Sequence, residues 1–192
     1  EAFLQQAEQS RNNKIKGCIL PWIHLHGDIR GEYALCCHTD NYFKDGNIIR
    51  TGDSSQAPLE VWNGEPMRKA RLQFLAGSYP EECSVCYDKE KIGIFSHRMG
   101  SNVDFKRFAK IQSLTRVDGS LPTPPVYLDF RFGNTCNFRC RMCGPDASTS
   151  WFKERHLSIG TTSEKASVDF WTNNEKFWND FSKIIDNIDT VY

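Results

Sequence analysis

Apolar and polar residues alternate most regularly between positions 126 and 132, which read VYLDFRF. A period of two residues is typical of a β-strand with one face toward a core. A glycine and an asparagine interrupt the alternation and end the predicted strand. A helix is predicted over 147–157, where Asp146 or Ser148 can cap the first turn. A loop therefore connects a strand to a helix.

The rest of the chain contains a second strand pattern and several helical ones. Two short runs within 18–37 flank a glycine-bounded turn, which predicts a β-hairpin with cysteines at its open end. Trp22, His24 and His26 share one face of its first strand, where aromatic packing is their expected role. Apolar residues at helical spacing predict helices over 59–76 (divided near Pro66, ended by Gly77), 84–99, 102–111 and 168–188, and a final strand starts at 189.

Three prolines and a glycine within 113–125 predict a linker between two domains. Residues 1–112 then form an α+β module built on a β-hairpin and helices. Residues 126–192 form the first part of an α/β domain, whose final helix carries an aromatic stripe that we interpret as core. Phe177, Trp178, Phe181 and Ile185 of this stripe are expected to be poorly covered.

Charge and length exclude several classes of function. The 192 residues carry 24 basic and 24 acidic side chains, so no nucleic-acid partner is expected. No apolar run is long enough to span a membrane, and no signal peptide is visible. Eight cysteines without an export signal predict a cytoplasmic, reducing location and metal chemistry instead of disulfides.

The loop after the 126–132 strand contains three cysteines, Cys136-x3-Cys140-x2-Cys143. A structural zinc site has four protein ligands, so three thiols suit zinc only if a fourth ligand comes from elsewhere. A cubane iron–sulfur cluster has four irons, and three thiolates leave one iron open to a small molecule. Both interpretations stay open on spacing alone.

This cysteine motif after a strand resembles the cluster motif of the radical S-adenosylmethionine (SAM) enzymes. The resemblance implies that Cys136, Cys140 and Cys143 hold a catalytic [4Fe-4S] cluster whose open iron binds SAM. An electron donor of the flavodoxin or ferredoxin type would supply the electron that cleaves SAM to a 5′-deoxyadenosyl radical. The residue before the last cysteine, commonly aromatic in the family, lies near adenine, and here it is Met142.

The same resemblance implies a partial (β/α)6 barrel, of which this chain contains only the first units. We therefore expect an N-terminal fragment, inactive alone. Relatives with auxiliary modules often modify peptides or proteins, so a peptide or protein substrate is expected.

The cysteines of the first half have a pattern of their own. Cys18-x12-Gly31-x4-Cys36, with Cys83-x2-Cys86 downstream, resembles the auxiliary cluster domains called twitch and SPASM. This implies a second, auxiliary [4Fe-4S] cluster, of the twitch type because no cysteines remain for another. In most relatives the module follows the catalytic core, whereas here it precedes it.

Two alternatives accompany this second resemblance. Four thiols also suit tetrahedral zinc, and a non-enzymatic zinc module that binds a protein partner is the rival for the whole chain. Adjacent strand residues point to opposite faces, so one site cannot easily use both Cys36 and Cys37. The spacing from Gly31 in the resemblance implies that the ligand is Cys36.

Overall fold

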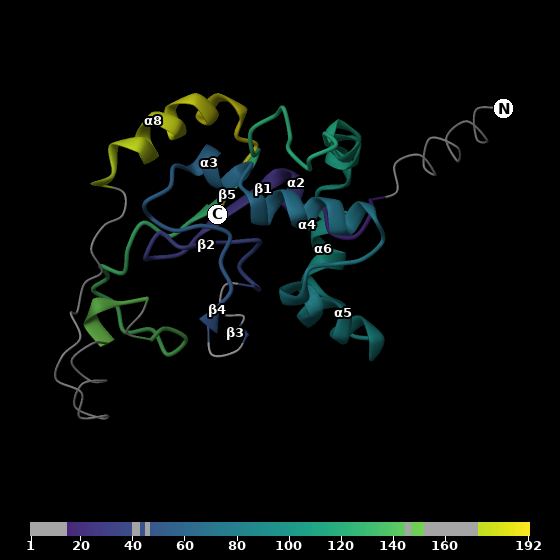
Figure 1. The fold of residues 1–192 in the computed structure, drawn as a ribbon. Coiled ribbons are helices and arrows are strands. Elements are labelled where there is room, and N and C mark those ends of the chain that lie inside the picture. Colours follow the sequence, from purple (N-terminus) through teal and green to yellow (C-terminus); the bar gives the residue numbers. More distant parts are fainter. Residues whose placement is uncertain (1–14, 40–42, 45–46, 145–146, 152–172) are drawn as a thin grey trace.

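The computed structural model describes residues 15–39, 43–44, 47–144, 147–151 and 173–192 (Figure 1). Its described elements form one four-stranded sheet, a small two-stranded sheet, and helices around them. In chain order they are α2 (Leu20–Ile23), β1 (His24–Gly27), β2 (Tyr33–Ala34), β3 (Phe43–Lys44), β4 (Asn47–Ile48), α3 (Pro58–Trp62), α4 (Glu65–Leu75), η1 (Glu81–Cys83), α5 (Ser84–Lys91), α6 (His97–Asp104), η2 (Lys106–Leu114), β5 (Tyr127–Phe130), α8 (Glu175–Ile184), η4 (Ile185–Asn187) and β6 (Thr190–Val191).

The four-stranded sheet has the order β2-β1-β5-β6 and joins strands from both halves of the chain. β1 pairs antiparallel with β2, which confirms the predicted hairpin, and parallel with β5. β5 also pairs parallel with β6, the strand predicted at 189. The fold is therefore mixed α+β with a small open sheet. The partial (β/α)6 barrel stays a prediction.

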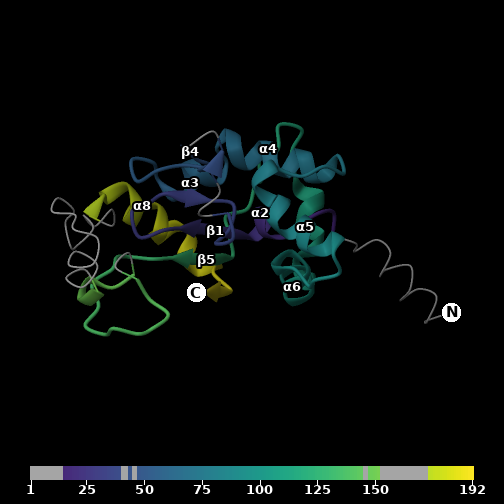
Figure 2. The same cartoon turned by 90° about the horizontal axis from the view of Figure 1, so that it is seen from below.

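One face of the sheet is covered by α8, beside which α3 lies (Figures 1 and 2). Phe130 on β5 packs edge-on against Phe177 of α8, with ring centroids 5.6 Å apart. α8 begins at Glu175, after Asn174, whose side chain accepts a hydrogen bond from the Lys176 N–H. The predicted helix extended back to 168, and residues 168–172 lie outside the described ones.

The expectation of a poorly covered stripe holds for only part of α8. Phe177 is buried, whereas Trp178 and Ile185 are about half exposed, at 48% and 50%. The stripe is therefore core along one edge and exposed along the other.

Three elements in the first half differ from the prediction. Residues 20–23 form the short helix α2, with Pro21 in its first turn, so β1 begins only at His24 and Trp22 is not on that strand. The helix predicted over 84–99 is two helices, because Gly93 adopts φ +79° after α5. α6 then restarts after Ser96, whose hydroxyl accepts a hydrogen bond from the Met99 N–H. The helix predicted over 102–111 is the end of α6 and the 3₁₀ helix η2.

The predicted division of 59–76 near Pro66 is confirmed by α3 and α4, and Gly77 ends α4 with φ +82°. The predicted apolar face of α4 was wrong at one position. Leu72 is 39% exposed, whereas the neighbouring Arg71 is completely buried. Its guanidinium donates to the backbone carbonyls of Pro21, Trp62 and Gly119 and to Oδ1 of Asn63. Arg71 thus connects four segments within the core.

The segment predicted as a linker, 113–125, packs closely against the first half. Leu121 is buried, and its N–H and C=O both bind the side chain of Asn63. The indole N–H of Trp62 donates to the Thr123 carbonyl at 2.8 Å. The domain boundary there stays a prediction.

None of the helices in the described part of the chain is both long and apolar enough to cross a bilayer.

Candidate metal centres

Four cysteines of the first half gather at one end of the four-stranded sheet. Cys18 precedes α2, Cys36 follows β2, Cys83 ends η1, and Cys86 lies in the first turns of α5. The Cys83 thiol is close enough to interact electrostatically with each of the other three, and Cys18 interacts with Cys86 in the same way. The structure therefore brings together the four residues that the sequence assigned to the auxiliary site.

Burial makes the thiols of Cys18, Cys36 and Cys83 difficult to ionise without a cation. Cys18, Cys36 and Cys86 are each less than a tenth exposed. Burial raises the pKa of Cys18 to about 12 and raises the pKa of Cys36 and of Cys83 well above the ordinary range. A bound metal centre would compensate by stabilising the thiolates, and its binding would release protons.

Backbone hydrogen bonding favours the thiolate form of two of these cysteines. The Leu20 backbone lowers the pKa of Cys18 against the effect of burial. The backbones of His38 and Thr39 do the same for Cys36. Hydrogen bonds to thiolate sulfur are a feature that tunes iron–sulfur centres.

Polar side chains from α6 and η2 hold the backbone around Cys18. Asn102 accepts from the Ile19 N–H and donates to the Gly17 carbonyl, both at 2.9 Å. Gln112 likewise accepts from the Lys16 N–H and donates to the Lys16 carbonyl, both at 2.9 Å. Arg98 adds a third contact, to the Gly17 carbonyl at 2.8 Å.

Sequence reasoning missed this support. Periodicity predicts only a helix over 102–111, and in sequence the amides of Asn102 and Gln112 are indistinguishable from surface amides. Only the tertiary contact across more than 80 residues shows their role.

Ligand spacing bears on the choice between zinc and a cluster. With Zn–S bonds of about 2.3 Å, tetrahedral zinc places its sulfurs about 3.8 Å apart. Among the described residues, there are two groups of three residues whose ligand atoms all lie within 4.8 Å of one another. Neither group is one of the two cysteine sets. A four-iron cluster is larger than a single ion and fits wider spacing.

The three-cysteine loop follows the carboxyl end of β5. Cys136 is partly buried, whereas Cys140, Cys143 and Met142 are exposed, Met142 almost completely at 98%. The loop folds back through hydrogen bonds to the Cys136 carbonyl, which accepts from the hydroxyls of Ser148, Thr149 and Ser150.

Residues 149–151 are helical, as the predicted helix over 147–157 requires, and the rest of that helix lies outside the described residues. The Trp151 indole N–H donates to the Cys140 carbonyl at 3.1 Å. The start of this helix is thereby tied to the middle of the cysteine loop.

The chain segments that carry the two cysteine sets lie toward opposite ends of the sheet (Figures 1 and 2). Cys18 precedes β1, and Cys36 follows the antiparallel strand β2, so both lie near the amino end of β1. The loop 136–143 follows the carboxyl end of β5, which runs parallel to β1. The two centres would therefore be separated by the length of these strands.

Cys37 points to different neighbours from Cys36. Its sulfur groups with ring nitrogens of His38 and His97, within 4.8 Å of one another. The rings of His38 and His97 stack with centroids 4.3 Å apart. Cys36 is instead coupled electrostatically to Cys18. The choice of Cys36 as ligand stays a prediction that this arrangement supports.

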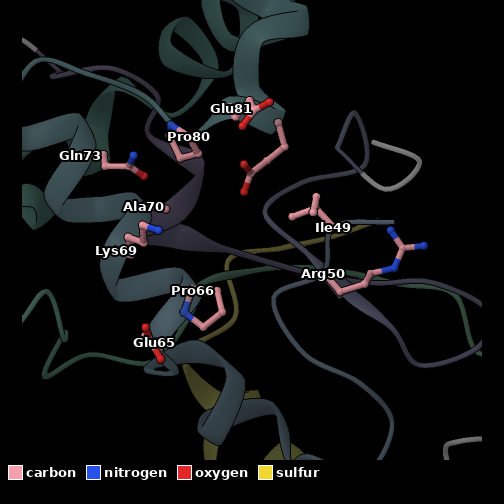
Figure 3. Close-up of a pocket in the computed structure, with 10 residues that line it drawn as sticks. Ile49, Arg50, Glu65, Pro66, Lys69, Ala70, Gln73, Pro80 and Glu81 are labelled. Atoms are coloured by element: carbon pink, nitrogen blue, oxygen red, sulfur yellow. The ribbon is translucent and has the colours of Figure 1, made fainter. Parts of the chain in front are cut away.

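A pocket of about 450 Å³ lies beside the four-cysteine site, and no cysteine lines it. Figure 3 shows Lys69 and Gln73 on α4 at one side, Pro80 and Glu81 above them, and Arg50 across the opening. Glu81 begins the 3₁₀ turn that ends at Cys83. The pocket wall is therefore continuous with the segment that carries a thiol.

Comparison with known families matches residues 18–87 to SPASM, described as an iron-sulfur cluster-binding domain. The matched segment starts at Cys18 and ends one residue after Cys86. This supports an auxiliary iron–sulfur domain of the kind found in radical SAM enzymes. The match does not include the loop 136–143. No curated protein and no solved structure is significantly similar to the chain.

Proposed function

We propose that this chain is part of a radical SAM enzyme with an N-terminal auxiliary cluster domain. The observation that carries the proposal is the position of the loop 136–143, directly after a parallel strand, in the same chain as the SPASM match. Cys136, Cys140 and Cys143 would hold the catalytic cluster. When bound, that cluster supplies the electron transfer that cleaves SAM.

The chain's own residues would bind and orient this centre. Three hydroxyls, from Ser148, Thr149 and Ser150, donate to the Cys136 carbonyl. These bonds would hold Cys136, the first ligand of the loop, against the start of the following helix. The thiols of Cys140 and Cys143 are exposed, so SAM would be able to reach a cluster held there. Met142, which is also exposed, would lie against adenine through its polarizable thioether.

The four thiols of the first half would hold the auxiliary cluster. Their place at the far end of the sheet suits a role in passing electrons or in anchoring substrate. A peptide or protein substrate and a flavodoxin- or ferredoxin-type electron donor complete the proposal. The proposal includes a single auxiliary cluster, as in the twitch type.

SAM binding at the loop cluster tests this function without requiring turnover. The chain is reconstituted anaerobically with iron and sulfide, reduced, and examined by electron paramagnetic resonance with and without SAM. We expect SAM to change the signal of one cluster. The variant with Cys136, Cys140 and Cys143 changed to Ala should lack that change, and a Cys83→Ala/Cys86→Ala variant should keep it. A SAM response that persists without the loop cysteines would contradict the proposal.

A further inference from the structure

A buried group of metal-type ligands lies between the two cysteine sets. β1 carries His24 and His26, and β5 carries Asp129. The parallel register places His26 opposite Asp129 and His24 opposite Tyr127, so all these side chains point to the same face of the sheet. His24, His26 and Asp129 are each at most 1% exposed.

Their polar atoms are close together. His26 Nδ1 lies 2.9 Å from Asp129 Oδ2. One ligand atom from each of the three residues lies within 4.8 Å of the other two. The rings of His24 and His26 are stacked with centroids 6.2 Å apart, and Tyr127 packs against His24 at 4.4 Å.

Some buried polar atoms of these three residues lack a hydrogen-bond partner. Both ring nitrogens of His24 and Oδ1 of Asp129 are buried without a hydrogen-bond partner. Buried polar atoms in native proteins are nearly always satisfied, by protein groups, water or an ion. The His26–Asp129 contact satisfies only one of the carboxylate oxygens.

We propose that His24, His26 and Asp129 form a mononuclear site for a divalent transition ion, Zn²⁺ or Fe²⁺, separate from both cysteine sets. Two imidazoles and one carboxylate are a donor set that suits these ions, and three protein ligands leave a position for water or another small ligand. A single ion satisfies His24 and the second carboxylate oxygen together. Strand periodicity alone predicts a packing role for these histidines, because their partner Asp129 is more than 100 residues away.

The nearest competing site provides a matched control. Cys37, His38 and His97 also bring three ligand atoms within 4.8 Å, but Cys37 and His97 are only partly buried and His38 is exposed. His97 is close enough to both His24 and Asp129 to interact with their charges. An ion bound at this second group is lost on changing His97 and kept on changing Asp129.

Metal titration of the cluster-loaded chain tests the site. Zn²⁺ or, as a spectroscopic probe, Co²⁺ is added, unbound ion is removed, and metal content is measured beside iron and sulfide. We expect one equivalent of added ion, with a cobalt spectrum that lacks thiolate charge-transfer bands. In Asp129→Asn the affinity falls about 100-fold or more, in line with the loss of a ligand. His97→Gln keeps the ion, and iron and sulfide stay unchanged in both variants.

A second variant keeps the test valid if Asp129→Asn folds poorly. His24→Phe removes the two unpartnered nitrogens while keeping a ring against Tyr127. We expect this variant to lose the ion and its melting temperature to be independent of Zn²⁺, whereas Zn²⁺ raises the melting temperature of the unmodified chain. Ferrous iron is tested under the same anaerobic conditions.

Three results overturn the site. One is no added ion in the unmodified chain, which leaves a buried water as the occupant. The second is an ion that survives His24→Phe but not His97→Gln. The third is cobalt bound through thiolate. Because iron and sulfide are counted separately, failure of this site and failure of the proposed function give different results.

Discussion

The side chain of Asn102 binds the backbone on both sides of Cys18. Its amide oxygen accepts from the Ile19 N–H and its amide nitrogen donates to the Gly17 carbonyl. A residue more than 80 positions away thus fixes the direction of the first auxiliary thiol. The match of residues 18–87 to a cluster domain does not include it.

Changing Asn102 should therefore loosen the auxiliary site without removing a ligand. Asn102→Asp keeps the acceptor for Ile19 but replaces the donor to Gly17 with an oxygen. We expect this variant to lose auxiliary-site iron faster than the unmodified chain in the presence of a chelator, by roughly the 10- to 100-fold typical of lost supporting contacts. Asn179→Asp on the exposed side of α8 is the charge-matched control and should behave like the unmodified chain. Equal iron loss in both variants would show that Asn102 does not position Cys18.

Cys36 and Cys37 should differ sharply as ligands. Cys36 is coupled to Cys18 and receives backbone N–H groups, whereas Cys37 groups with two histidines. Cys37→Ser should keep the auxiliary cluster, and Cys36→Ser should lose it or bind it weakly. Iron content and visible absorption after anaerobic reconstitution measure the difference. The reverse order of the two variants would rule out the assignment.

Arg71 should be among the most sensitive core positions. Replacing it with Leu leaves the carbonyls of Pro21, Trp62 and Gly119 without their buried donor. We expect the free energy of unfolding to fall by about 2–4 kcal/mol, measured by denaturant titration. Arg68→Leu on the same helix, where the side chain is only partly buried and forms an ion pair with Asp118, should cost about 1 kcal/mol or less. Similar losses in both variants would contradict a structural role for the buried guanidinium.

The sequence predicted the elements better than the contacts between them. The strand at 126–132, the hairpin and the divided helix at 59–76 follow from periodicity and from Gly and Pro positions, which act locally. The burial of Arg71 could not be predicted, because a charge becomes tolerable only when carbonyls from distant segments meet it.

The candidate sites divide in the same way. Cysteine spacing is local information, so both sets could be selected from sequence. The parallel pairing of β1 with β5 brings His26 opposite Asp129, and no local pattern encodes that register. The role of the Asn102 amide next to Cys18 could not be predicted either, because it depends on the packing of α6 against residues 17–19.

Glu90 should make stability depend on acid pH. Hydrogen bonding to Arg98, opposed by burial, lowers the pKa of Glu90 below its ordinary value of 4.5. A lowered pKa in the folded state means that this contribution is present above pH 4.5 and is lost as the pH falls through the folded-state pKa. Glu90→Gln should therefore lower the free energy of unfolding by about 1 kcal/mol at pH 7. The difference from the unmodified chain should shrink toward zero on acidification, and urea titrations at several pH values measure it. A difference that is independent of pH would contradict the ionised pair.

Iron and sulfide counting in matched cysteine variants tests the central claim, two independent clusters, most directly. Anaerobic reconstitution of the unmodified chain should give about eight iron and eight sulfide per chain, as two [4Fe-4S] clusters require. Changing Cys136, Cys140 and Cys143 to Ala should leave about half of each, and so should changing Cys18, Cys36, Cys83 and Cys86. A colourless protein that binds zinc without sulfide would contradict the account, as would the loss of all iron from the variant that lacks only the loop cysteines.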